Sequence, residues 1–218
     1  MLKVCYMNVF ENHLHSLTTL LNEHGESLEI YQTHVGSVGS WAWEAGIALC
    51  FYLYDHMFHE MKDRHIIEIG AGTGLVGLQV CALGAHTTLT DREEYVDLMN
   101  YNINKNRHLL TGTVEAQMLF WGDARLNEKE YDYIIAANCV YHSIDLDSLI
   151  QTICQLTTTN KTQLICCYEL RNDGIRQLVN EFHEKLKQDK FHIEYVEHEM
   201  LRKDYQNDYN CIVKCKRL

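Results

Sequence analysis

The sequence predicts an α/β fold in which a mostly parallel sheet is covered by helices and includes an antiparallel last strand. Apolar runs of strand length alternate with segments whose apolar residues recur at helical spacing, which is typical of parallel sheets. A glycine-rich turn follows one of these runs, at the kind of position where open α/β sheets bind ligands. Two further strand-like runs follow each other without a helical segment between them, so we expect them to pair antiparallel.

The length and composition are those of one globular domain. The chain has 218 residues, of which 46% are hydrophobic and 22% charged, and it contains no proline. No linker or repeat divides it, so we expect a single domain over residues 1–218. Residues 1–36 are expected to form an N-terminal elaboration with two short strands, Lys3–Val9 and Leu28–Thr33. No signal-like segment and no run of about 18 apolar residues occurs, so neither export nor a membrane span is expected.

Charge and cysteine usage narrow the partners and the compartment. With 19 basic and 30 acidic side chains, the formal net charge of −11 repels a phosphate backbone, and no basic stripe offsets it. Nucleic acid is therefore not an expected partner. The nine cysteines include no Cys-x-x-Cys pair, and Cys166 and Cys167 are adjacent in an apolar run. This pattern indicates buried thiols in a reducing compartment, so a cytoplasmic location is expected.

The expected elements follow in chain order from the periodicity. Strands are predicted at His65–Ile69, Thr87–Thr90, Val114–Phe120, Tyr131–Ala137, Gln163–Tyr168, Phe191–Val196 and Tyr209–Lys214. Helical spacing is clearest at Ile47–Phe58, Leu146–Ile153 and Ile175–Leu186. The third helix follows Asn172, Asp173 and Gly174, whose small polar residues suit a helix start.

The glycine-rich turn indicates a cofactor with a cationic part. The segment from Ile66 to Leu75 passes from an apolar strand through three glycines into a helix, which lets a ligand approach the backbone closely. Gly74 follows Gly70 by four residues, whereas the dinucleotide fingerprint needs about five. Glu68 also places a carboxylate where a pyrophosphate would lie. S-adenosylmethionine fits better, because it carries an ammonium and a sulfonium.

Asp91 is the candidate for binding a ribose. It ends the second strand of the alternating core and follows Gly70 by 21 residues, close to the roughly 20-residue offset at which an acidic side chain meets ribose hydroxyls. The alternative is that Asp91 only caps the next helix, which is expected to begin near Arg92.

Several motifs resemble those of one enzyme family. The pattern Glu68-x-Gly70-x-Gly72-x-Gly74 looks like motif I of the seven-β-strand methyltransferases. Four further motifs are similar to the non-histone protein lysine methyltransferases: the segment from Gly39 to Ala45, Asn102-Ile103-Asn104-x-Asn106, Trp121-Gly122, and Cys166-Cys167-Tyr168-Glu169-x-Arg171. The likeness extends from about Val35 to Lys214. It implies a seven-stranded, doubly wound, Rossmann-like methyltransferase fold, S-adenosylmethionine as the donor and a protein lysine as the acceptor.

The resemblance also implies a partner and a set of cofactor contacts. Within the family the likeness is nearest to members that act on valosin-containing protein, so an AAA ATPase or another chaperone-like protein is the implied acceptor, and a monomeric enzyme is expected. The cofactor contacts fall on Trp43, Gly70, Ala71, Gly72, Asp91, Trp121 and Ala137, beside Glu68. Trp121 is expected to flank adenine and Trp43 to close over the methionine end. Core packing is the alternative for Trp121, and chemistry alone does not separate Trp43 from Trp41.

The acceptor site is expected where the fourth strand ends. Relatives usually carry aspartate where Asn138 stands, three residues before an aromatic, which here is Tyr141. We expect Tyr141 to hold the acceptor amine through its hydroxyl and ring face, and Asn138 to accept a hydrogen bond through its carbonyl. Tyr141 and Asn138 are therefore the candidate catalytic residues. Methyl transfer to an amine is an in-line displacement that needs no metal.

Two alternative functions stay open at this point. The ends of Asn138-x-x-Tyr141 match the Asn-Pro-Pro-Tyr signature of methyltransferases that act on amide or adenine nitrogens, although both prolines are missing, so an amide-nitrogen or small-amine acceptor is one alternative. A catalytically weak cofactor-binding protein that holds a partner is the other, favoured by the missing aspartate. A zinc site is not expected, because Asp63 stands where a histidine would have to follow His59 on one helix face.

Overall fold

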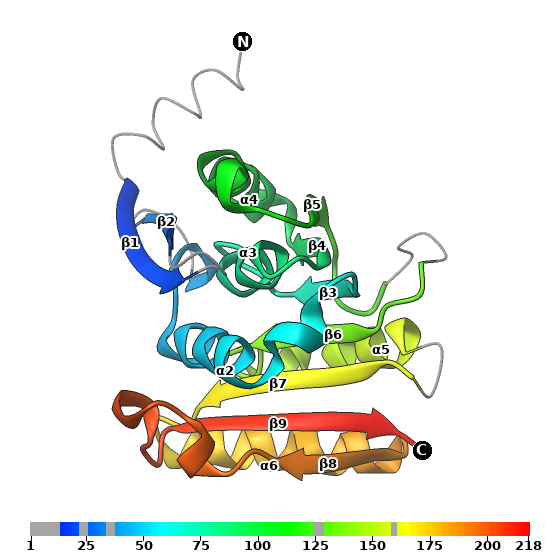
Figure 1. The fold of residues 1–218 in the computed structure, drawn as a ribbon. Coiled ribbons are helices and arrows are strands. Elements are labelled where there is room, and N and C mark those ends of the chain that lie inside the picture. Colours follow the sequence, from blue (N-terminus) through cyan, green and yellow to red (C-terminus); the bar gives the residue numbers. More distant parts are fainter. Residues whose placement is uncertain (1–13, 22–25, 34–37, 124–128, 158–160) are drawn as a thin grey trace.

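The predicted α/β architecture is confirmed. The computed structural model describes residues 14–21, 26–33, 38–123, 129–157 and 161–218. Seven strands form one sheet in the order β5-β4-β3-β6-β7-β9-β8 (Figure 1). Neighbouring strands are parallel from β5 to β7, whereas β9 runs antiparallel to both β7 and β8.

The elements of the core match most predicted segments closely. The strands are β3 (His65–Ile69), β4 (His86–Asp91), β5 (Thr113–Met118), β6 (Tyr133–Ala137), β7 (Gln163–Glu169), β8 (Phe191–Tyr195) and β9 (Asn210–Arg217). The main helices are α2 (Glu44–Met61), α3 (Leu75–Ala82), α4 (Glu93–Asn106), α5 (Leu146–Leu156) and α6 (Asp173–Gln188). The predicted start of α6 is confirmed, because the side chain of Asn172 accepts a hydrogen bond from the backbone amide of Ile175 at 3.0 Å.

Alternation along the strands divides the core between the two faces of the sheet. Ile66 packs in a cluster with α2, α3 and α4, while the next residue, Ile67, packs in a second cluster with α5 and α6. Successive side chains of a strand point to opposite faces, so buried strands carry apolar residues at every position. Both faces are thus covered. The carboxyl ends of β3, β4 and β6 meet at one edge, where the loops that follow them come together.

The N-terminal part forms a separate two-stranded antiparallel sheet. β1 (Leu14–Leu21) pairs with β2 (Ser27–Thr33), and β2 contains the strand predicted at Leu28–Thr33. The strand predicted at Lys3–Val9 lies outside the described residues, and β1 was not predicted.

Two asparagines of α4 dock this small sheet onto the core. The side chain of Asn102 accepts from the Tyr31 amide at 2.8 Å and donates to the Tyr31 carbonyl at 2.9 Å. Asn106 makes the same pair of bonds with Glu29, both at 2.8 Å. Residues four apart on a helix share a face, and residues two apart on a strand share a side, so the two amides act as a substitute for a neighbouring strand.

No helix within the described ranges is long and apolar enough to cross a bilayer. The eight cysteines in those ranges are free thiols, and six of them are buried, as the composition predicted.

Candidate active site

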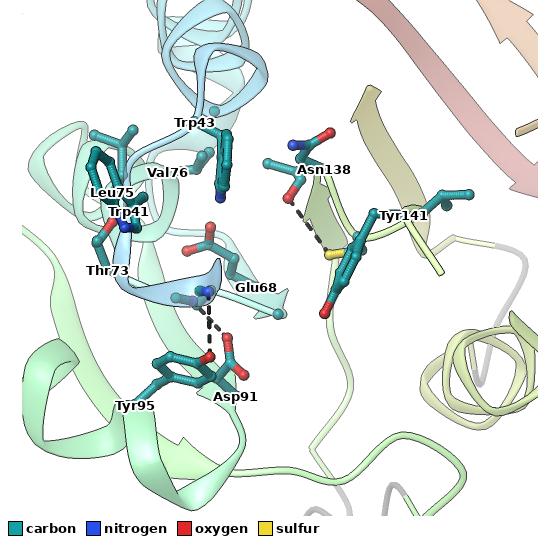
Figure 2. Close-up of a pocket in the computed structure, with 18 of the residues that line it drawn as sticks. Trp41, Trp43, Glu68, Thr73, Leu75, Val76, Asp91, Tyr95, Asn138 and Tyr141 are labelled. Atoms are coloured by element: carbon teal, nitrogen blue, oxygen red, sulfur yellow. Dashed lines mark hydrogen bonds between the residues drawn. The ribbon is translucent and has the colours of Figure 1, made fainter. Parts of the chain in front are cut away.

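A cavity of about 550 Å³ opens at the carboxyl ends of β3, β4 and β6, beside the start of α2 (Figure 2). All ten residues predicted to bind cofactor or acceptor line it: Trp43, Glu68, Gly70, Ala71, Gly72, Asp91, Trp121, Ala137, Asn138 and Tyr141. They come from the ends of β3, β4 and β6, from the loops that follow β3, β5 and β6, and from the start of α2, and the parallel sheet brings them to one edge. Their individual roles remain predictions.

The glycine loop brings bare backbone to the cavity. Gly72 has a φ of +55°, and a β-carbon placed there would lie 2.5 Å from the carbonyl oxygen of Gly39. Only glycine fits both the left-handed backbone and the close approach. The amide of Gly72 donates to Oδ2 of Asp91 at 2.7 Å. The carboxylate therefore ties the end of β4 to the loop after β3.

Asp91 lies outside the cap position of the following helix. Arg92 occupies the N-cap position of α4, and Oδ1 of Asp91 accepts from the adjacent Arg92 amide at 2.7 Å. The carboxylate lines the cavity. Burial is the main cause that raises the pKa of Asp91, while its hydrogen bonds from the Arg92 and Gly72 amides act in the opposite direction. This placement favours a ligand contact over the helix-capping alternative.

Glu68 forms part of the inner wall. Only 2% of its surface is exposed, and its Oε2 accepts from the Gly77 amide in α3 at 2.7 Å. Burial, helped by the charge of Asp91, raises its pKa to about 8, although the hydrogen bond from the Gly77 amide acts in the opposite direction. The carboxyl is therefore largely protonated at neutral pH, and a cation bound in the cavity favours its ionised form. A ligand with a positive centre suits this wall better than an anion.

The acceptor candidates lie across the cavity from Trp43 and Glu68 (Figure 2). Asn138 has a φ of +56°, a left-handed conformation that asparagine tolerates better than most residues. Its Oδ1 accepts from the Glu169 amide at 3.3 Å, so the side chain is already held by the end of β7. Tyr141 is 45% exposed, and partial burial is the main cause that raises its pKa. The hydroxyl of Tyr141 is thus a proton donor at neutral pH.

The cavity is also lined by residues for which no role was predicted from the sequence. Tyr95 accepts a hydrogen bond from the Gly39 amide at 3.3 Å and lies near the loop (Figure 2). Its position within a helix did not indicate that it would lie at the cavity. Glu169 and Arg171 also line the cavity, although the motif that contains them predicted only a family resemblance. Their position could have indicated a place in the site. Glu169 ends a strand and Arg171 follows it, and the carboxyl ends of parallel strands share one edge of the sheet.

The described residues contain no cluster of side chains that could bind a metal ion. Among the side chains that the structure describes, no three His, Cys, Asp or Glu residues are grouped as metal ligands.

Comparison with known families decides the assignment. Residues 22–189 match the model of a family described as lysine methyltransferase. The chain belongs to this lysine methyltransferase family. The match includes the glycine loop, Asp91, the end of β6 and the end of β7, so the whole cavity lies within the family's region.

Curated members of the family resemble the chain over part of their length. Protein N-lysine methyltransferase METTL21A of Xenopus tropicalis is 32% identical over 59% of this chain and 60% of that protein. The mouse METTL21A is 30% identical over 66% of this chain and 69% of that protein. Protein-lysine methyltransferase METTL21E of the mouse is 35% identical over 55% of this chain and 53% of that protein. The chain thus spans between about half and two thirds of these relatives. The expected closeness to the enzyme of valosin-containing protein stays a prediction.

Solved structures share the fold. A ribosomal protein L11 methylase from Lactobacillus delbrueckii matches with a TM-score of 0.59 and 14% identity over 94% of this chain and 98% of that one. A magnesium protoporphyrin IX methyltransferase from Synechocystis, crystallised with bound S-adenosylmethionine, matches with a TM-score of 0.56 and 15% identity over 79% and 78%. At these identities the likeness extends to the fold alone, and it confirms the Rossmann-like methyltransferase architecture.

Proposed function

We propose that this protein transfers methyl groups from S-adenosylmethionine to a lysine side chain of a non-histone protein. One observation carries the proposal: within the region that matches the lysine methyltransferase family, a single cavity joins the glycine loop and Asp91 to Asn138 and Tyr141. The proposed donor and acceptor sites thus share one partly enclosed space.

The residues at the loop fit the cofactor. Asp91 offers carboxylate oxygens for ribose hydroxyls beside the bare backbone of Gly72. Glu68 favours a cationic centre at the inner wall. Two half-buried indoles, Trp43 and Trp121, offer flat apolar surface for the ends of the ligand. When bound, the cofactor supplies the methyl group as an electrophile on its sulfonium.

The acceptor side has to present a neutral amine. A free lysine has a pKa near 10.4, so removing its proton at pH 7 costs about 4.6 kcal/mol. Partial enclosure of the cavity disfavours the ammonium, which lowers this cost. The hydroxyl and ring of Tyr141 orient the amine, while Asn138 shapes the strand end beside it. Alignment of amine and methyl group supplies much of the remaining acceleration.

The acceptor protein is proposed from resemblance. The likeness to members acting on valosin-containing protein supports an AAA ATPase or another chaperone-like protein, and the names of the METTL21 relatives support a protein lysine. Free buried thiols support a cytoplasmic location. We further propose that the enzyme acts as a monomer.

The test is transfer of a radiolabelled methyl group from S-adenosylmethionine to proteins of a cell extract. We expect one or a few labelled protein bands and no label in RNA or DNA, with mass spectrometry placing the methyl group on a lysine. Label on glutamine would favour the amide-nitrogen alternative.

A catalytically weak cofactor-binding protein is the second candidate. The observation that favours it is the engagement of the Asn138 oxygen with the Glu169 amide, where an aspartate of relatives would add a negative charge. Binding of S-adenosylmethionine without any labelled acceptor would support this candidate.

A further inference from the structure

We propose that Glu169 is a positioning residue that fixes Trp43 over the cofactor site and links it to the acceptor strand. The inference rests on the proposed function, because it assigns Trp43 to the methionine end of the cofactor. Glu169 ends β7, lines the cavity and is 9% exposed. Neither the sequence patterns nor the catalytic roles above account for a carboxylate buried at this point.

Both carboxylate oxygens of Glu169 accept hydrogen bonds. Oε1 accepts from the Ala45 amide at 3.0 Å, and Oε2 accepts from Nε of Arg171 at 2.6 Å. Ala45 lies in the first turn of α2, whose free amides and positive dipole end favour a carboxylate. Glu169 thus anchors the start of α2 to the end of β7, across 124 residues of sequence.

Arg171 connects Glu169 to the indole of Trp43. Its guanidinium carbon lies 4.3 Å from the ring centre of Trp43, within the roughly 6 Å range of a cation–π contact. Trp43 occupies the N-cap position of α2, directly before the helix that Glu169 anchors. The indole is therefore fixed from two directions, through its own backbone and across its ring face. Both constraints depend on the single carboxylate of Glu169.

The same residue is connected to the acceptor side. The backbone amide of Glu169 donates to Oδ1 of Asn138 at 3.3 Å. A continuous series of contacts runs from Asn138 through Glu169 and Arg171 to Trp43. Rotation of the indole and placement of the acceptor strand end are thus not independent of each other. We infer that the Glu169-x-Arg171 motif helps to set the distance between Trp43 on the donor side and Asn138 on the acceptor side.

A matched control exists elsewhere in the molecule. Asp55 pairs with Arg202 through two bonds of 2.7 and 2.8 Å, and the guanidinium carbon of Arg202 lies 4.0 Å from the ring centre of Phe51. This group has the same three parts, a carboxylate, an arginine and an aromatic ring, and it does not line the cavity. Asp55→Asn therefore removes an equivalent ion pair from α2 without touching the site.

The experiment measures S-adenosylmethionine affinity by calorimetry, and single-turnover methyl transfer, for the purified full chain. Glu169→Gln keeps an acceptor for the Ala45 amide and removes the charge that holds Arg171, while Arg171→Met removes the cation and leaves Glu169 in place. We expect each to weaken cofactor binding about tenfold, and the double variant to be no weaker than either single one. Arg171→Lys should recover part of the loss, because it keeps the charge without the planar stack. Asp55→Asn should bind like the wild type.

The outcomes distinguish this inference from a general loss of stability and from a failure of the proposed function. If Glu169→Gln and Arg171→Met bind and transfer as the wild type does, or if their losses add in the double variant, the inference is wrong. An equal loss in Asp55→Asn would also overturn it, because the effect would then reflect general stability. If Glu169→Gln does not fold, Arg171→Met decides alone. A wild-type protein that binds no S-adenosylmethionine would instead contradict the proposed function.

Discussion

The carboxylate of Asp91 and the backbone amide of Gly72 form a 2.7 Å hydrogen bond that joins the end of β4 to the glycine loop after β3. The bond aligns an acidic side chain and a bare stretch of backbone along one wall of the cavity. The carboxylate also lines the cavity, where we propose that the ribose hydroxyls bind.

Asp91→Ala should weaken S-adenosylmethionine binding by about 1.5–3 kcal/mol, because charge-assisted hydrogen bonds of this strength are lost. Calorimetry measures the effect directly. Asp91→Asn is the matched control, because it keeps one oxygen for the Gly72 amide while it loses the charge and the second accepting oxygen, so we expect a smaller loss than in Asp91→Ala. Unchanged affinity in Asp91→Ala, or binding of NAD by the wild type, would rule out the assigned cofactor wall.

Glu68 should make cofactor binding depend on pH. Its pKa in the free protein is raised to about 8, chiefly by burial, so the carboxyl is largely protonated at pH 7. A bound cation favours the carboxylate, which means that binding releases a proton and that affinity rises as the pH increases from about 6 to about 9. Glu68→Gln should flatten this rise.

The amine of S-adenosylmethionine also titrates near this range, so the comparison with Glu68→Gln is essential. Calorimetry at pH 7 in buffers of different ionisation enthalpy counts the protons released. We expect the wild type to release more protons than Glu68→Gln does. Equal release by the two proteins would show that Glu68 does not exchange its proton on binding.

The local patterns of this sequence predicted most of the core. His65–Ile69 was predicted to the residue as a strand, because an apolar run bounded by a charged residue and a glycine leaves little freedom. The insertion of β9 between β7 and β8 was not predicted. The antiparallel pairing of β8 with β9 follows from their succession in the chain, but β7 lies before α6 and β8, and periodicity within a strand carries no information about such a distant neighbour.

The site was predictable to the extent that it lies at strand ends. Asp91 and Asn138 could be assigned because the carboxyl ends of parallel strands share an edge. The role of Asn102 could not be assigned from the sequence, although the residue lies in a motif that resembles the family. Its hydrogen bonds reach Tyr31, 71 residues away, and depend on where the small N-terminal sheet docks. A buried asparagine has no sequence signature that names its partner.

Asn102 should therefore be important for stability. Its side chain is fully buried, bonds to both backbone groups of Tyr31, and donates to the Thr73 carbonyl at 2.9 Å. Asn102→Ala leaves these backbone groups without partners, so we expect the free energy of unfolding to fall by about 2–4 kcal/mol in urea titrations. Asn104→Ala is the control, because Asn104 is exposed on the same helix. Equal losses in the two variants would contradict the docking role of Asn102.

Asn138 is the clearest departure from the family's pattern, and its exchange tests the acceptor site. Asn138→Asp suits the left-handed backbone at this position and adds a negative charge beside the acceptor amine. We expect faster single-turnover methylation of a lysine acceptor at saturating donor, with cofactor affinity changed by less than about 1 kcal/mol. Tyr141→Ala should nearly abolish turnover in either background, because it removes both the hydroxyl and the ring that orient the amine.

The direction of the Asn138→Asp effect depends on where the charge acts. A carboxylate stabilises the bound ammonium as well as the positive charge that develops on the amine, and only an interaction stronger in the transition state raises the rate. If the charge mainly retained the proton, binding of the acceptor would tighten while the rate stayed flat. A flat rate in Asn138→Asp together with full activity in Tyr141→Ala would place the acceptor elsewhere on the cavity rim. The weakly catalytic binding protein would then be the better account of this chain.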